Sequence, residues 1–227
     1  MTLGEKKEKS HNLEEEFEKF GETERRILEA AVSVFGEKGF DGARIDEIAE
    51  ASGANKGMLY YYFGSKEKLY TGIIEMIFKK VAEIIMDNLA DMNPDTLYEG
   101  ISSFIEKYID FIYTNYKIVR VLVWELARGA DIIRGVIRKE MSTKFPILVS
   151  GFNEAVKAGK LRPMDPRHAF ISIIAMVVFY FAANRVISAV WNDDAMSAEN
   201  VEARKREVTE FVIRAIKAED IKVEDIK

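Results

Sequence analysis

The residues of this chain that could do chemistry gather in one short stretch, from Lys56 to Lys66. Tyr60, Tyr61 and Tyr62 lie between these two lysines, and a serine directly precedes the second. Lysine ammonium groups and tyrosine hydroxyls suit phosphate oxygens, and a helix N-terminus adds outward-pointing backbone N–H groups. Because successive side chains on a helix point about 100° apart, the three tyrosines cannot all face one core. The stretch therefore suggests contact with phosphate groups.

Signals for catalysis or metal binding are sparse in the rest of the sequence. The chain has no cysteine, and its two histidines, His11 and His168, are far apart and lack neighbouring ligand patterns. We find no nucleophile with a base at motif spacing and no glycine-rich phosphate loop. We therefore expect no metal site, no cofactor and no enzymatic activity.

Two short helices joined by a tight turn must position the phosphate-binding candidates. Ile48 and Ala49 lie on one helical face, Gly53 falls where that helix must stop, and Leu59 resumes an apolar face. Glycine accepts a positive φ in such a turn at little cost. A small residue, a turn glycine and an apolar anchor at this spacing are typical of a helix-turn-helix, whose second helix enters the DNA major groove. A helical hairpin that binds no DNA is the alternative, because three positions alone are a weak signal.

A longer stretch, Arg25 to Tyr70, resembles the DNA-binding domain of the TetR (tetracycline repressor-like) family. It covers about a fifth of the chain, and the rest is similar only in length and helical layout. The matching positions follow one another in fixed order: Ile27-Leu28, Ala30-Ala31, Phe35, Gly39-Phe40, Ile48-Ala49, Gly53, Gly57, Leu59-Tyr60-Tyr61, Phe63, Ser65-Lys66-Glu67 and Leu69.

The resemblance implies a set of DNA contacts and a second, helical domain that binds an effector and forms a dimer. The residues it assigns to DNA binding are Arg44, Asn55, Lys56, Gly57, Met58, Tyr60, Tyr61 and Lys66. Asn55 and Lys56 fill positions at which the family varies its base contacts, so we expect them to bear on operator choice.

The stretch departs from the family pattern at two places. Ala43-Arg44 stands where the family has a threonine pair that caps a helix and touches phosphate. The lost side-chain cap costs about 1 kcal/mol, but Arg44 could supply a charged phosphate contact instead. Tyr62 stands where histidine is common.

The amino-acid composition restricts the classes of function that this chain could have. The 227 residues, 48% hydrophobic, suffice for two lobes, and the charged first twenty residues hold no signal peptide, so we expect a cytoplasmic location. The net charge is −5, and residues 21–75 carry seven basic and ten acidic side chains. This balance argues against non-specific coating of nucleic acid. DNA binding must rely on cations placed locally on the DNA face, namely Arg44, Lys56, Lys66 and Lys68. The acidic balance also leaves an alternative open: an all-α small-molecule carrier or enzyme that keeps a vestigial helix-turn-helix.

Helical periodicity and the lack of any β pattern predict an all-α fold of about nine helices. We expect a polar leader over 1–20, a helix-turn-helix DNA-binding domain over 21–67 and an effector-binding and dimerisation domain over 68–227. In the leader, Leu13, Phe17 and Phe20 suggest an amphipathic turn or two. The expected longer helices are 24–38, 66–91, one beginning at 93–94, 118–127, 131–158 with a break near Pro146, one beginning at 165–166, and 198–217.

The second lobe is rich in aromatic and methionine side chains. Most of them fill a core, but the family resemblance implies an effector cavity enclosed by the first four helices of this lobe. Such walls suit a large, mainly apolar ligand. The candidate wall residues are Met86, Phe104, Tyr108, Phe111, Trp124, Met141, Phe145, Phe152 and Phe179, with Arg120, Glu125 and Arg128 as charged candidates.

Residues 169–183 carry no charge, but fifteen apolar residues are too few for a membrane span of about 20. We therefore expect a buried helix and no membrane partner. The terminal helices of this region resemble the dimerising four-helix bundle of the TetR family. The resemblance implies a homodimer interface at Ala175, Ala182, Ala189, Val208, Phe211 and Val212. The alternative is that these helices cover the core of their own domain.

These features together predict a ligand-responsive transcriptional regulator. Its partners would be a double-stranded, palindromic DNA operator, a second copy of the chain, and a small, mainly apolar molecule that releases a repressor from the operator.

Overall fold

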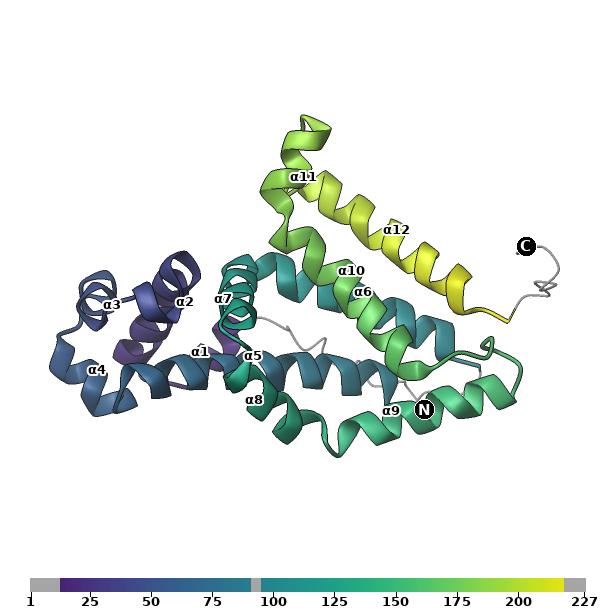
Figure 1. Cartoon of the computed structure of the whole chain (residues 1–227), viewed down its shortest axis with the longest axis horizontal. Helices are drawn as coiled ribbons and strands as arrows, with labels where there is room; N and C mark the ends of the chain where they lie inside the picture. The colour runs from purple at the N-terminus through teal and green to yellow at the C-terminus, as the bar shows by residue number, and fades with distance from the viewer. Residues whose placement is uncertain (1–12, 91–94, 219–227) are drawn as a thin grey trace, which may run out of the picture.

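The computed structural model describes residues 13–90 and 95–218, and within these ranges the chain forms twelve helices and no strand (Figure 1). The predicted all-α class is confirmed. Three helices exceed the nine expected, because the leader contributes one and two expected helices are each broken in two. The helices are α1 Leu13–Phe17, α2 Glu22–Gly42, α3 Ile45–Ser52, α4 Lys56–Phe63, α5 Lys66–Leu89, α6 Leu97–Thr114, α7 Tyr116–Ala127, α8 Asp131–Met141, α9 Lys144–Lys157, α10 Pro166–Ala182, α11 Asn184–Trp191 and α12 Ala198–Ile216.

Helices α2, α3 and α4 form a small head at one end of the molecule, and α5 runs from this head into the body formed by α6 to α12 (Figure 1). Helix α5 begins at an N-cap, where the Ser65 hydroxyl accepts a hydrogen bond from the backbone N–H of Lys68. Its 24 residues correspond to roughly 36 Å of helix. One continuous element therefore reaches from the head deep into the body.

Helix α7 is the body element that packs against the head. It lies along α2, whose course is kinked at Gly39 with φ of +68°. A Cβ atom at Gly39 would lie 3.0 Å from the Trp124 ring of α7, so only glycine allows this approach. The predicted helix end at Lys38 is therefore a kink, after which α2 continues to Gly42.

The expected helix 131–158 is broken just before Pro146, as predicted. Helix α8 ends at Met141, and Pro146 lies in the first turn of α9, where a missing backbone N–H costs no helical hydrogen bond.

The apolar helix after Asp165 is bent sharply. Its two parts, α10 and α11, meet at 72°, a break that neither proline nor glycine marks in the sequence. Within the described residues no single helix is long and apolar enough to cross a membrane, and this bent pair passes such a test only when its two parts are taken together. The alanine stripe is therefore not continuous, because Ala189 lies on α11 while Ala175 and Ala182 lie on α10.

The end of the leader packs on both the head and the body. Leu13 and Phe17 of α1 are buried, while Phe20 is exposed, and α1 contacts both α2 and α5. Buried Glu16 faces the ammonium groups of Lys79 and Lys80 on α5, at 3.9 and 4.0 Å. The rest of the leader, the expected helix start at 93–94 and the chain end after 218 lie outside the described residues.

Candidate DNA interface and effector cavity

Helix α4 is anchored to the head by one apolar side chain and turns most of the others outward. Leu59 is 2% exposed, whereas Tyr60, Tyr61 and Tyr62 are 46%, 83% and 37% exposed. Three tyrosines at the surface of an eight-residue helix give it an unusual supply of hydroxyl groups. The sequence-based expectation that the tyrosines cannot all face a core is confirmed.

The turn that precedes α4 has the geometry that the glycine spacing predicts. Gly53 ends α3 in the left-handed region, at φ 64° and ψ 20°, and its N–H donates to the Ala49 carbonyl. Asn55 then caps α4, because its Oδ1 accepts a hydrogen bond of 2.9 Å from the Met58 N–H. A Cβ at Gly57 would lie 3.1 Å from that oxygen, so this glycine leaves room for the cap.

Lys56 begins α4 and already has a partner within the head. Its Nζ lies 3.0 Å from Oδ1 of Asp46 in the first turn of α3, and both side chains are well exposed. The hydrogen bond to Asp46 raises the pKa of Lys56. A DNA phosphate must therefore compete with Asp46 for this ammonium group.

Arg44 is the N-cap residue of α3 and makes no side-chain cap bond, as the sequence predicted. The helix end is nevertheless partly satisfied, because Oε2 of Glu47 accepts a hydrogen bond of 3.2 Å from the Arg44 backbone N–H. Lys38 donates to the other carboxylate oxygen at 2.7 Å, and this bond is the main reason why the pKa of Glu47 is lowered. The Arg44 side chain itself is exposed.

Lys66 lies at the base of the head. Its Nζ is 4.5 Å from the centre of the Phe40 ring, so the ammonium group faces the end of α2. Lys68 is exposed in the same turn and passes beside Gly64, which connects α4 to α5. Lys68, predicted from the sequence as one of the cations of the DNA face, is thus a further exposed cation at this end of α5.

An apolar cavity of about 580 Å³ lies in the body between α5 and α10. Helix α5 contributes Ile77, Phe78, Val81 and Ile85 to its wall, and α7 contributes Leu122. Three predicted wall residues also line it: Tyr108, Met141 and Phe145. The volume is within the range of small-molecule sites in proteins.

Two family models match the chain, one over most of the head and the start of α5 and one over most of the body. A family model described as "Bacterial regulatory proteins, tetR family" matches residues 27–73. A second, described as "Tetracyclin repressor-like, C-terminal domain", matches residues 98–212, half of the chain. The chain belongs to the TetR family.

The TetR-family assignment extends to proteins similar over most of the chain. The HTH-type transcriptional regulator RutR of Escherichia coli K12 is 29% identical over 195 residues, which are 83% of this chain and 89% of RutR. The HTH-type transcriptional repressor NicS of Pseudomonas putida is 29% identical over 177 residues, 74% of this chain and 79% of NicS. A crystal structure of the transcriptional regulator FadR of Bacillus subtilis in complex with stearoyl-CoA shares the fold, with a TM-score of 0.63 at 20% identity, over 84% of this chain and 98% of that one.

The chain is therefore a helix-turn-helix transcriptional regulator. Regulators of this family bind DNA operators and small-molecule ligands and act as dimers. The alternative of a carrier or enzyme with a vestigial helix-turn-helix is not favoured.

Among the described residues, no group of three histidine or carboxylate side chains could hold a metal ion.

Six of the nine predicted wall residues of this TetR-family protein do not line the 580 Å³ cavity. Phe104 and Phe152 line a smaller hollow next to it, and Phe111 is buried in the core. Met86 is half-buried and lies one position beyond the wall residue Ile85. The remaining two, Trp124 and Phe179, lie elsewhere for clear reasons: Trp124 packs on Gly39 of the head, and Phe179 is 69% exposed.

The position of Phe179 follows from the helical repeat. Phe170 and Ile174 of α10 line the cavity, and Phe179 lies nine positions after Phe170, which is about half a turn away around the helix. Its side chain therefore points away from Phe170, on the side of α10 beyond Ile171, which lies at the edge of the cavity-lining residues. The sequence alone did not show which side of the uncharged run would face the cavity.

The charged candidates Glu125 and Arg128 lie at the boundary between head and body. The Phe40 ring contacts both Lys66 and Arg128, whose guanidinium carbon is also 4.5 Å from the ring centre. Arg128 Nε is 3.2 Å from Asp41 of α2, and buried Glu125 accepts hydrogen bonds from Arg128 and from the Ile132 N–H. This cluster ties the end of α7 to the end of α2.

Tyr70 completes the contact between head and body. Its ring packs edge-on against Phe35 of α2 at 4.9 Å, and its hydroxyl donates to the Val121 carbonyl of α7 at 3.5 Å. Burial, together with the nearby Glu125 carboxylate, raises the pKa of Tyr70. The head is thus joined to the body by packed aromatic rings as well as by charges.

The predicted dimer residues fall into two groups. Ala175, Ala182 and Ala189 are exposed, and Phe211 is 65% exposed. Val208 and Val212 are each 2% exposed within the single chain, so they offer little surface to a second copy. Further exposed apolar side chains lie on α10 and α11: Ile171, Phe179, Val186 and Val190.

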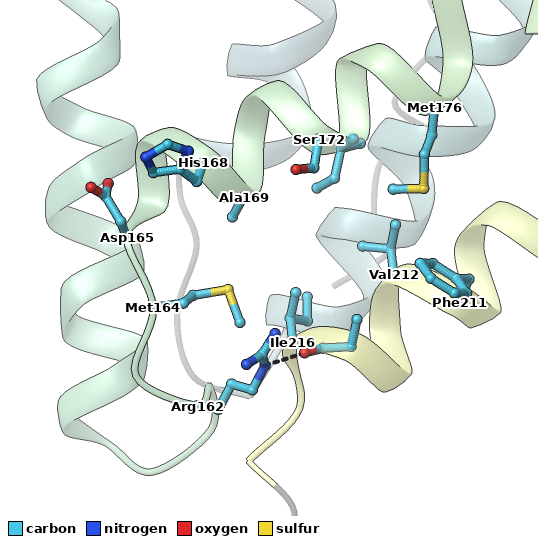
Figure 2. A pocket seen from close by; sticks show the side chains of 12 residues that line it. Arg162, Met164, Asp165, His168, Ala169, Ser172, Met176, Phe211, Val212 and Ile216 are labelled. Atoms are coloured by element: carbon cyan, nitrogen blue, oxygen red, sulfur yellow. Dashed lines mark hydrogen bonds between the residues drawn. The ribbon is translucent and has the colours of Figure 1, made fainter. Parts of the chain in front are cut away.

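An open groove of about 410 Å³ runs between α10 and α12 beside Phe211 (Figure 2). His168, Ser172 and Met176 line it from α10, while Phe211 and Ile216 line it from α12. At its lower end in Figure 2, Arg162 Nε donates to the backbone carbonyl of Ala215, which ties the loop before α10 to the end of α12. The groove borders the exposed apolar side of α10.

Proposed function

We propose that this protein is a homodimeric repressor that a small, mainly apolar molecule releases from a palindromic operator. The observation that carries the proposal is the course of α5. Its first turn follows the exposed helix α4, and Ile77, Phe78, Val81 and Ile85 of the same helix line the cavity. A ligand that displaces the cavity wall therefore acts on an element that supports the head.

The coupling follows from linkage and needs no contact between ligand and DNA. A dimer reads two half-sites only when its recognition helices are about 34–36 Å apart or a multiple of that distance. A ligand that binds better to another arrangement of α5 shifts the population away from the DNA-binding arrangement. A coupling free energy of about 1–3 kcal/mol weakens operator binding roughly 5- to 150-fold.

The cavity wall favours an apolar effector. Nearly all of the wall side chains are aliphatic, aromatic or methionine. FadR, which shares the fold, was crystallised with stearoyl-CoA, a ligand with a long apolar chain. A wall of this composition stabilises a ligand chiefly by removing apolar surface from water.

For the DNA contacts we retain the eight residues that the family resemblance implies and add Lys68. Tyr61, the most exposed of the tyrosines, and Lys56 lie on α4, the proposed recognition helix. Arg44, exposed at the start of α3, is suited to a phosphate contact.

For the dimer interface we propose the exposed side of α10 together with α11 and the exposed residue of α12. Ala175, Phe179 and Ala182 recur at helical spacing along α10, and Ile171, which shares their face, also lines the effector cavity. Phe211 of α12 lines the groove between α10 and α12. Apolar side chains in such a row are typical of protein interfaces, and small alanines allow two helices to approach closely.

The proposed function is tested by fluorescence anisotropy with duplex DNA from the region upstream of the protein's own gene, at several salt concentrations. We expect tight, salt-dependent binding that a scrambled duplex of equal length does not reproduce. Tyr61→Ala should weaken binding, whereas Lys157→Ala, a cation at the far end of α9, should not. Equal affinity for the upstream and scrambled duplexes would contradict operator recognition.

A further inference from the structure

Few side chains of the cavity wall are polar, and the charged ones among them are all positive. Apart from the Tyr108 hydroxyl, its polar side chains are Arg138, Ser142 and Arg167, and no carboxylate lines the cavity. Arg138 lies in the last turn of α8, and Ser142 follows at the break between α8 and α9. An apolar site that carries two arginines and no acid is expected to discriminate among apolar molecules by their charge.

Arg167 is already neutralised within the chain. Its Nε donates to both carboxylate oxygens of Asp165 at 3.0 Å, and a second nitrogen of the guanidinium also contacts this carboxylate. These bonds are the main reason why the pKa of Asp165 is lowered to about 2. Asp165 therefore remains charged at neutral pH and balances Arg167.

Arg138, an exposed residue, is the arginine of the cavity wall that has no carboxylate partner among the described residues. Its two cationic neighbours on α8 both have partners: Arg134 contacts Asp131, and Lys139 lies 3.2 Å from Glu75. Among residues 13–90 and 95–218, no carboxylate forms an ion pair with Arg138. Arg138, the cation of α8 that lines the cavity, is thus the cation of this helix that no carboxylate neutralises among the described residues.

We propose, on the basis of the proposed function, that the effector is an anionic amphiphile. Its apolar chain fills the cavity between α5 and α10, and its anionic head group is bound by Arg138 at the break between α8 and α9. The Ser142 hydroxyl provides a second hydrogen-bond donor there. Arginine suits this task because its planar guanidinium can donate two parallel hydrogen bonds to a carboxylate or phosphate.

The chain-length-matched probes dodecanoate, dodecan-1-ol and dodecyltrimethylammonium test the proposal, each below its micelle-forming concentration. Binding to the full-length protein is measured by isothermal titration calorimetry. A hydrogen bond to a charged group is worth enough to favour dodecanoate over dodecan-1-ol by about tenfold or more, and the cationic probe should bind most weakly.

Arg138→Gln identifies the residue responsible, with Arg134→Gln as the matched control on the same helix. Arg138→Gln should weaken dodecanoate binding about tenfold and leave dodecan-1-ol unchanged, whereas Arg134→Gln should change neither. Dodecanoyl-CoA in place of dodecanoate shows whether the head group is a free carboxylate or a phosphate of a larger thioester. Binding of either anion supports the proposal.

The outcomes separate this proposal from the proposed function. Equal affinities for dodecanoate and dodecan-1-ol, or equal weakening by the Arg138 and Arg134 variants, would overturn the anionic head group. Operator affinity that is unchanged when dodecanoate saturates the cavity would contradict ligand release and leave the head-group assignment standing. Failure of all three probes to bind would overturn both.

Discussion

Arg128 and Asp41 join the body to the head: Nε of Arg128, just after α7, lies 3.2 Å from Oδ2 of Asp41, near the end of α2. Six positions before Arg128, Leu122 of the same helix lines the cavity. Helix α7 is therefore a second connection between the cavity and the head, in addition to α5. The two connections can be separated by mutation.

Arg128→Gln should weaken the effect of ligand on DNA. The Asp41 side chain is 77% exposed, so this ion pair contributes at most about 1 kcal/mol to stability. Arg128→Gln also removes the cation beside buried Glu125, so thermal unfolding checks that it folds, and Asp41→Asn, which leaves the Glu125 pair in place, is measured beside it. Operator affinity is measured with and without saturating ligand. Arg134→Gln, which removes an exposed ion pair of α8 instead, serves as control. Full coupling in Arg128→Gln would show that α5 alone carries the signal.

Asp46→Asn should strengthen DNA binding. The substitution frees Lys56 from its ion pair and removes a negative charge from the proposed DNA-facing side. We expect the salt slope of binding to become steeper by about one unit. Lys56→Ala should have the opposite effect, costing roughly 1–3 kcal/mol on the preferred site and relaxing its sequence preference. Glu50→Gln, an exposed acid of the same helix, is the matched control. An unchanged salt slope in Asp46→Asn would exclude competition between Asp46 and phosphate.

The head could be predicted from the sequence because its geometry is local. The position of Gly53 in the left-handed region and the single anchor Leu59 both follow from spacing within a few residues. The cap of α3 was missed, although Arg44 and Glu47 have the spacing of a capping box, because the expected cap was a hydroxyl at position 43 or 44.

The cavity could be predicted only in part, because core and wall use the same side chains. Phe104 and Tyr108 lie one turn apart on α6, yet only Tyr108 reaches the main cavity. What separates them is the placement of α8, α9 and α10, which is set by long-range packing. The bend at Ala183 is marked by neither proline nor glycine, although the Asn184 side chain donates a hydrogen bond to the Phe181 carbonyl there.

Ala182→Glu should disrupt the dimer. Exposed Ala182 lies on the side of α10 that bears Phe179, and a buried unpaired carboxylate at an interface costs several kcal/mol. Sedimentation velocity should show monomers, while Lys157→Glu on α9 should remain dimeric. If Ala182→Glu is insoluble, Phe179→Ser provides a milder change. A stable dimer in both α10 variants would move the interface elsewhere.

The attachment of α1 should weaken in acid. Burial alone would raise the pKa of Glu16, but the hydrogen bond from Lys19 and the charges of Lys79 and Lys80 outweigh it and lower the pKa below 4.5. The stabilisation is therefore present above about pH 4.5 and is lost as the pH falls through the lowered value. Hydrogen exchange should show faster exchange in α1 than in α5 over this window. Glu16→Gln should exchange fast in α1 at every pH, and equal protection in variant and wild type would rule out the ionic attachment.

Filling the cavity should imitate the ligand. Val81 lines the cavity on α5, and a tryptophan there adds a bulky ring between α5 and the facing wall. If α5 transmits displacement to the head, Val81→Trp should lower operator affinity about 5- to 150-fold without ligand, while the dimer persists. The same variant should no longer bind an alkyl ligand, because the ring occupies its volume. Met86→Trp, half-buried on the same helix but outside the cavity, controls for general disruption, and thermal unfolding confirms that both variants fold. Operator affinity equal to wild type in a folded, ligand-blocked Val81→Trp would show that α5 does not couple the cavity to DNA, and equal losses in both variants would attribute the effect to packing damage.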